Sequence, residues 1–208
     1  MRCLLCIGRQ DSEQATTSDG KAKNHASTSV DNSTQQTTDD PRIPLNSRQR
    51  FTLVKNWKGI SREAERTGAN MFVRMLEQHP DLYGQFKFQA LQGASKSTQL
   101  DNETLQSHGE RVMSVFDRAI TSVDRPDDFF ALLHQHARDH AAMTQFKPED
   151  FWHMEEPFLY AVKITLDDRY TENMEHVYKT MINLILDTMA SECKRARQEM
   201  DRARQQLS

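Results

Sequence analysis

The aromatic residues of this chain occupy only part of its length. All sixteen of them, two Trp, four Tyr and ten Phe, lie between Phe51 and Tyr178 of the 208 residues. Large apolar side chains supply most of a buried core, so the first fifty residues cannot form a core of their own. A chain of this length is also too short for two full catalytic domains. The sequence therefore predicts one folded domain that follows an unstructured arm.

The composition and the spacing of apolar residues favour an all-α domain. Gly and Pro number only seven and six, while Met, Leu, Glu, Gln, Arg and Ala are abundant, as is typical of helices. We expect helices near residues 47–66, 68–78, 102–122, 126–140, 148–165 and 171–205. The last shows the clearest apolar face, with steps of three and four residues, formed by Met174, Val177, Tyr178, Met181, Ile182, Ile185, Leu186 and Met189.

The two ends of the chain differ from the domain between them. From Gly8 to Asp40 the only Val, Ile, Leu, Met or aromatic residue is Val30, which is too little apolar surface to offset chain entropy. We therefore assign residues 1–46 to a disordered arm and residues 47–192 to the domain. Residues 193–208 are rich in Lys and Arg and predict a solvated basic helical extension, with a contact to acidic lipid or protein as the alternative.

Charge and cysteine content restrict the partners and the compartment. A formal net charge of −3 gives no long-range attraction for phosphates, so we expect no nucleic-acid partner. Three cysteines, placed at Cys3, Cys6 and Cys193, cannot form a disulfide framework, which indicates a reducing compartment and a cytoplasmic location. The sequence has no run of about 18 apolar residues that would span a membrane.

The extreme N-terminus carries a possible lipid anchor. Cys3 and Cys6 lie beside Leu4, Leu5 and Ile7, and this arrangement resembles N-terminal double-palmitoylation signals. Two acyl chains would hold the protein stably at the inner face of the plasma membrane. Arg2 stands where myristoylation requires Gly. The alternative is that both cysteines are incidental.

Histidines mark the candidate site. His108 shares a helical face with Val112, four residues later, in the expected helix 102–122. His136 and His140 lie one turn apart in the expected helix 126–140. A zinc site at this pair is incomplete, because neither a Cys nor a His-Glu-x-x-His arrangement supplies the remaining ligands.

These histidines and several other positions together resemble the globin family. Trp57 precedes Gly68 by eleven residues, the run 72–86 ends in Phe86, and His108 opens a run that is similar to the distal helix of neuroglobin-like hexacoordinate globins. His140 follows His108 by 32 residues, the spacing from distal to proximal histidine in those globins. The resemblance covers about residues 47–192.

The resemblance implies a globin fold, a three-over-three helical sandwich around haem b, in which His140 is the proximal and His108 the distal iron ligand. Phe86 would contact the haem, Phe72 and Val112 would line its distal side, and Arg111 would pair with a propionate. Gly68 would allow the second helix to cross closely over the distal helix. The implied partners are dioxygen or another diatomic gas and an electron-transfer partner.

Several alternatives stay open at this stage. In the family, Leu and Gly stand four and three positions before the proximal histidine, whereas His136 and Ala137 stand there before His140. Counting from His136 gives Leu132 and Leu133, which keeps the Leu, so His136 is the alternative ligand. We expect a bis-histidyl globin in redox or gas-sensing signalling, with pentacoordinate oxygen storage or transport as the alternative. A haem-free helical interaction module is the second alternative. The sequence shows no catalytic triad or phosphate-binding loop, so turnover such as nitrite reduction would belong to the haem.

Overall fold

The computed structural model describes residues 40–206, and within them the chain forms helices and no strand, which confirms the all-α expectation. The α-helices of the described residues are α1 (Ser47–Ser61), α2 (Ala64–Gln78), α3 (Leu82–Gln85), α4 (Lys96–Leu100), α5 (Glu103–Thr121), α6 (Pro126–Ala141), α7 (Glu155–Leu166) and α8 (Glu172–Gln206). Short 3-10 helices connect some of them, namely η2 (Gln89–Leu91), η3 (Pro148–Met154) and η4 (Asp167–Arg169). None of the described helices is long and apolar enough to cross a membrane.

Local sequence signals explain where the main helices begin. Asn46 caps α1 by accepting a hydrogen bond from the Gln49 amide, and the Gln49 side chain accepts one from the Asn46 amide in return. Asn102 caps α5 through Oδ1, which accepts from the Leu105 amide at 3.0 Å. Pro126 stands in the first turn of α6, where its missing amide hydrogen costs nothing.

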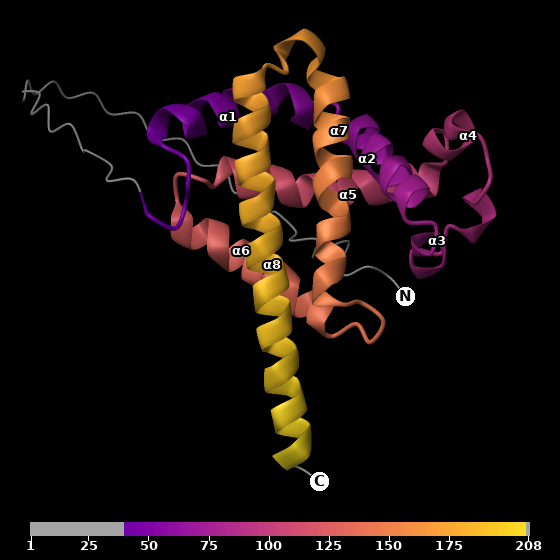
Figure 1. Ribbon diagram of the computed structural model, residues 1–208, viewed down its shortest axis with the longest axis vertical. Helices are drawn as coiled ribbons and strands as arrows, with labels where there is room; N and C mark the ends of the chain where they lie inside the picture. Colours follow the sequence, from indigo (N-terminus) through magenta and orange to yellow (C-terminus); the bar gives the residue numbers. More distant parts are fainter. Residues whose placement is uncertain (1–39, 207–208) are drawn as a thin grey trace, which may run out of the picture.

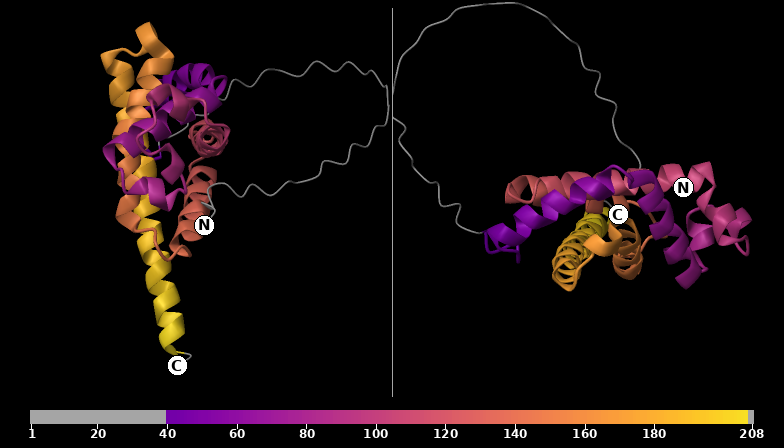
Figure 2. Two further views of the ribbon diagram at one scale, coloured as in Figure 1. Left: turned by 90° about the vertical axis from the view of Figure 1, so that its right-hand side faces the viewer. Right: turned by 90° about the horizontal axis from the view of Figure 1, so that it is seen from above.

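The helices form the two-layer sandwich that the resemblance implies. Helices α7 and α8 run antiparallel beside each other, and α5 and α6 cross behind them (Figure 1). The view from above shows the same two layers, and the last turns of α8 project beyond all the other helices (Figure 2). The packing of α6 against α8 and of α2 against α5 joins the layers. The cavity described below lies between these pairs.

Glycines permit the close crossing of α2 over α5 that the sequence predicts. A Cβ atom on Gly68 would lie 2.5 Å from the carbonyl oxygen of Gly109, and a Cβ on Gly109 would lie 2.5 Å from the carbonyl carbon of Gly68. Both contacts are shorter than real Cβ atoms show, so each helix requires glycine at this point. The crossing fixes how α5 presents His108, the residue that precedes Gly109.

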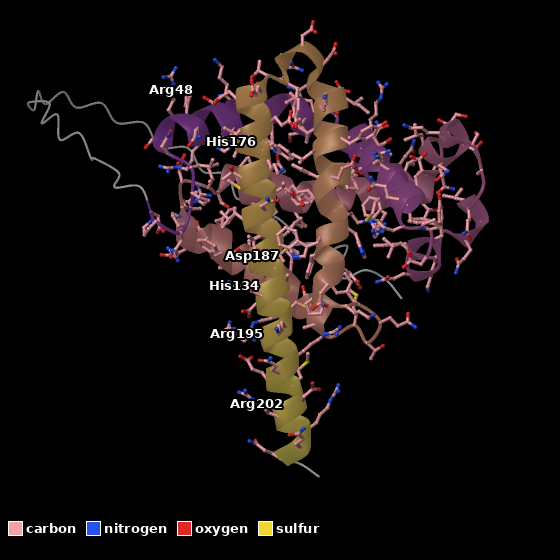
Figure 3. All side chains as sticks on the ribbon, viewed as in Figure 1. Arg48, His134, His176, Asp187, Arg195 and Arg202 are labelled. Carbon is pink, nitrogen blue, oxygen red and sulfur yellow. The ribbon has the colours of Figure 1, made fainter. Side chains whose placement is uncertain are left out.

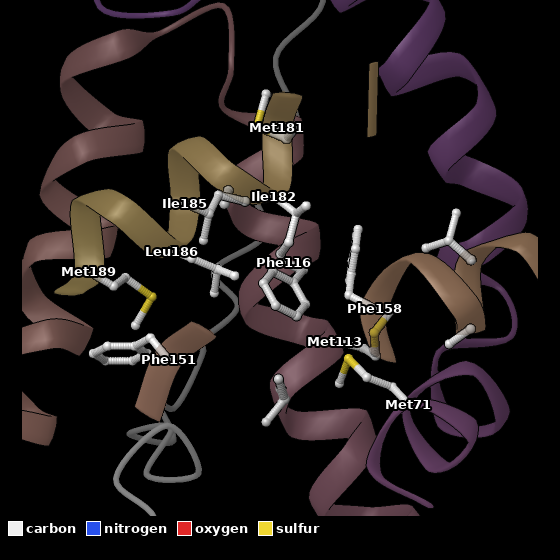
Figure 4. Close-up of a cluster of buried hydrophobic side chains, with 14 of the residues drawn as sticks. Met71, Met113, Phe116, Phe151, Phe158, Met181, Ile182, Ile185, Leu186 and Met189 are labelled. Atoms are coloured by element: carbon white, nitrogen blue, oxygen red, sulfur yellow. The ribbon is translucent and has the colours of Figure 1, made fainter. Parts of the chain in front are cut away.

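The core joins side chains from both layers. Figure 4 shows Met71 of α2, Met113 and Phe116 of α5, Phe158 of α7 and Ile182 of α8 in one cluster. Behind them, Trp57 of α1 is 1% exposed and satisfies its indole nitrogen by donating to Asp117 Oδ1 at 2.9 Å.

Several boundaries differ from the expectation. Helix α1 ends at Ser61 rather than near residue 66, and Gly68 lies inside α2 instead of just at its start. The segment 79–102 holds α3, η2 and α4, which the sequence did not predict, because pieces of three to five residues have no helical apolar period.

The ends of the folded part also need correction. Ile43 and Leu45, which the sequence placed in the arm 1–46, are 4% and 2% exposed and join the core. Burial of these two apolar side chains attaches residues 40–46 to the domain. The remainder of the expected arm, residues 1–39 with Cys3 and Cys6, lies outside the described residues. Residues 193–206 continue α8 as expected, but Cys193 and Ala196 are buried, so this extension is not solvated throughout.

Candidate functional site

An apolar cavity of about 670 Å³ lies between α2, α5, α6, η3 and α8. All six residues that the resemblance implied as haem contacts line it, namely Phe72, Phe86, His108, Arg111, Val112 and His140. The lining does not include His136. The structure therefore brings the predicted residues together, although they come from three helices and the turn after α3.

His140 occupies one wall of the cavity, in the last turn of α6. His140 is only 1% exposed, and its Nδ1 atom lies 2.7 Å from the carbonyl oxygen of His136. Because a carbonyl oxygen only accepts hydrogen bonds, Nδ1 carries the proton, and Nε2 keeps its lone pair for a metal. The rings of Phe146 and Phe151 pack at 4.8 and 5.0 Å from the His140 ring and limit its rotation.

His136 has a different environment. Burial lowers the pKa of its imidazole, which keeps the ring neutral at neutral pH. Its backbone carbonyl orients His140, while its side chain is outside the cavity lining. This geometry favours His140 over His136 as the iron ligand.

His108 lines the same cavity from α5 and is 8% exposed. The rings of Phe72, Phe86 and Phe88 meet it edge-on, with centroids at 4.6, 5.3 and 6.0 Å. Phe86 and Phe88 both reach it because Lys87 between them has a φ of 63°, in the left-handed region that side-chain-bearing residues seldom adopt. Three aromatic rings thus hold one imidazole at the wall of the apolar cavity.

Arg111 lies at the exposed side of the cavity. Its Nε donates to the Ser107 carbonyl oxygen at 3.0 Å, and Nη2 contacts Ser107 Oγ at 3.2 Å. The guanidinium is therefore held along its own helix, one turn from His108. Lys87 also lines the cavity, so two cations flank it where an acidic group of a ligand would meet solvent.

The residues fit a flat cofactor that brings its own metal. Within residues 40–206 no group of three or more His, Cys, Asp or Glu side chains could hold a bare ion. A metal that is already ligated in the plane of a macrocycle needs only axial nitrogens, and His108 and His140 stand on two walls of one cavity. The volume lies within the range of cofactor pockets, so the donor set and the apolar lining suit haem.

Sequence reasoning missed several lining residues. Phe88, Phe146, Phe151, Leu186 and Met189 all line the cavity, and Figure 4 shows Phe151 of η3 beside Met189 and Leu186 of α8. The apolar face of α8 was predicted as core, but nothing in its period distinguishes core from cavity wall. Nothing in the sequence indicated that Phe88 lines the cavity, because only the backbone conformation at Lys87 turns its side chain inward.

Comparisons with known proteins agree with this arrangement. A family model described as Globin matches residues 69–189. Neuroglobin from Tetraodon nigroviridis is 24% identical over 146 residues, which cover 70% of this chain and 91% of that protein.

Solved structures give the same result. A hexacoordinated heme protein from an anhydrobiotic tardigrade shares 30% identity with a TM-score of 0.69, covering 74% of this chain and 99% of that chain. Hemoglobin from the botfly Gasterophilus intestinalis has a TM-score of 0.62 at 14% identity, covers 72% of this chain and 99% of its own, and supports the fold alone. Because the family model spans more than half of the sequence and the helices form the same sandwich, the chain belongs to the globin family, whose members bind haem and, through it, dioxygen and other small gases.

Proposed function

We propose that the cavity holds haem b with His140 as its proximal ligand, and that His108 is the sixth ligand until a diatomic gas replaces it. On this proposal the protein acts in redox or gas-sensing signalling with an electron-transfer partner. The observation that carries the proposal is the pair of buried imidazoles, on α5 and on α6, that line one apolar cavity.

The residues of the cavity have separate tasks. Haem, when bound, supplies an iron that takes one protein nitrogen on one side and a gas or a second nitrogen on the other. The carbonyl of His136 holds His140 in the tautomer that presents Nε2. Phe72, Phe86 and Phe88 exclude water around His108, and water promotes oxidation of ferrous iron.

Two features support the bis-histidyl form over the pentacoordinate one. His108 is buried among aromatic rings rather than turned toward solvent, so its imidazole is already inside the cavity. The tardigrade protein, which is 30% identical in sequence to this chain, is described as hexacoordinated. A globin with its sixth position filled suits redox or sensing chemistry better than bulk oxygen storage.

The proximal assignment is tested by haem retention. We expect His140→Ala to lose most stably bound haem, because no other cavity residue presents a nitrogen from α6, whereas the matched variant His136→Ala keeps a haem spectrum. Absorption of the purified, hemin-reconstituted proteins measures this. If His136→Ala loses haem and His140→Ala keeps it, the ligand is His136; if the unaltered chain binds none, the protein is a haem-free module.

The distal assignment is tested by the ferrous, gas-free spectrum. We expect a six-coordinate low-spin spectrum for the unaltered protein and a five-coordinate high-spin spectrum for His108→Leu, since leucine fills similar space without a nitrogen. A high-spin spectrum of the unaltered protein refutes bis-histidyl ligation and favours oxygen storage or transport.

A further inference from the structure

The start of the basic extension makes specific contacts with the proximal side of the cavity. Three α8 residues, Glu192, Arg197 and Glu199, reach α6 or the loop 142–147 that follows it, and Arg195 pairs with Glu192 on α8 itself. We call these four residues the C-terminal brace. They lie beyond residue 189, where the match to the globin family ends. The brace is therefore an addition of this chain to the part of the fold that the family model describes.

The first contact of the brace is with α6 itself. Glu192 is 4% exposed, and its carboxylate pairs with Arg138 of α6 at 2.7 Å and with Arg195 at 2.5 Å. Arg138 also lies 3.5 Å from Glu199. A carboxylate so buried is stable only when cations compensate it, so α8 is tied to the turn of α6 that carries His140, two residues after Arg138.

The second contact is with the loop after α6. Arg197 Nη2 donates to the carbonyl oxygen of Met143 at 2.6 Å and also to the carbonyl oxygen of Phe146. Both residues line the cavity, and the Phe146 ring packs 4.8 Å from the ring of His140. One guanidinium thus fixes the backbone that places Phe146 against the candidate iron ligand.

We infer that the C-terminal brace sets the position of His140, with Arg197 as the positioning residue that acts through Phe146. This inference rests on the proposed function and extends it: residues outside the family match tune how firmly the proximal ligand is held. A loop without Arg197 leaves the Phe146 carbonyl without this charged donor and frees the ring that limits His140 rotation.

The test compares Arg197→Ala with Arg202→Ala in the full-length protein. Arg202 is an exposed arginine of the same helix, on the part that projects past the other helices, whereas Arg195 lies farther up, within the brace (Figure 3). We expect Arg197→Ala to accelerate amide hydrogen exchange in residues 142–147 and to speed hemin loss to excess apomyoglobin about tenfold, the worth of one charged hydrogen bond. Arg202→Ala should change neither.

A spectroscopic measurement distinguishes an effect of Arg197 on His140 from an effect on the loop alone. In a His108→Leu background the ferrous iron has one axial imidazole, and we expect Arg197→Ala to shift its iron–histidine stretching band. Unchanged hemin loss and an unchanged band refute the inference, even if loop exchange accelerates. If the Arg197→Ala protein loses its helical circular dichroism signal, Arg197→Lys replaces it in the comparison with Arg202→Ala. Lysine keeps a charged donor for one of the two carbonyl oxygens.

The outcomes also separate this inference from the proposed function. An unaltered chain that retains no hemin refutes both. A chain that retains hemin equally well with and without Arg197, and whose iron–histidine band is also unchanged, refutes only the brace.

Discussion

The Gly68–Gly109 crossing makes a quantitative prediction for Gly109→Ala. The added Cβ would lie 2.5 Å from the Gly68 carbonyl carbon, 2.8 Å from the Ala69 nitrogen and 2.9 Å from the Gly68 oxygen. Ordinary contact begins at 3.4 Å, so α2 and α5 must separate by about 0.9 Å. The atoms in the way are backbone, which cannot rotate aside as a side chain can.

Two opposing terms set the magnitude. Alanine is about 1 kcal/mol better than glycine in a helix interior, whereas overpacking costs about 1–3 kcal/mol and a backbone clash belongs at the upper end. We therefore expect the free energy of unfolding to fall by about 2 kcal/mol, which lowers Tm by roughly 4–8 °C in a domain of this size.

Gly84→Ala is the matched control, because the nearest atom to its added Cβ is Gln89 Nε2 at 3.9 Å. We expect this variant to be unchanged or up to about 1 kcal/mol more stable. Urea unfolding of the haem-free proteins, followed by circular dichroism, measures both without a contribution from ligand binding. A Gly109→Ala protein as stable as Gly84→Ala refutes the close crossing.

Two further predictions concern acid stability and the N-terminus. Burial first, and then the nearby charge of His153, lower the pKa of His79 from 6.5, with Asp81 opposing; the two imidazole rings lie 4.1 Å apart. The unfolded chain therefore binds protons before the folded chain as pH falls through 6.5. We expect the free energy of unfolding to decrease as the pH falls below 6.5, and to decrease less in His79→Gln. Urea unfolding at several pH values measures this, and equal decreases in the two proteins contradict the prediction. For the N-terminus, we expect the intact protein in the membrane fraction of cells and the Cys3→Ser, Cys6→Ser double variant in the soluble fraction, because two acyl chains anchor stably; if both stay soluble, the cysteines are incidental.

The sequence predicted the parts of the fold that a helical period encodes. The α8 face from Met174 to Met189 is buried as expected. The meeting of His108 and His140 in one cavity also followed, but from resemblance, since 32 residues of spacing alone do not bring two side chains together. The choice between His136 and His140 stayed open in the sequence because His136 and Ala137 stand where the family shows Leu and Gly before its proximal histidine.

The buried stripe of α6 does not by itself separate the two histidines. Phe129, Leu133, Ala137 and Ala141 are buried at steps of four residues, and residues three apart on a helix share a face, so His136 lies beside Leu133 just as His140 lies beside Ala137. The packing around α6 distinguishes them, because His140 is 1% exposed whereas His136 is only half-buried.

The C-terminal brace shows what a sequence pattern cannot contain. Residues after Cys193 read as a charged helix, and such helices are usually solvated. Arg197 departs from that expectation because its partners are the carbonyl oxygens of Met143 and Phe146, and backbone carbonyls exist at every residue, so they leave no signature. Glu192 gives the only local hint, since a glutamate in register with buried Met189 and Ala196 needs a cation beside it. One cation is Arg195, three residues later on the same helix. The other is Arg138, 54 residues earlier, and only the packing of α6 on α8 identifies it.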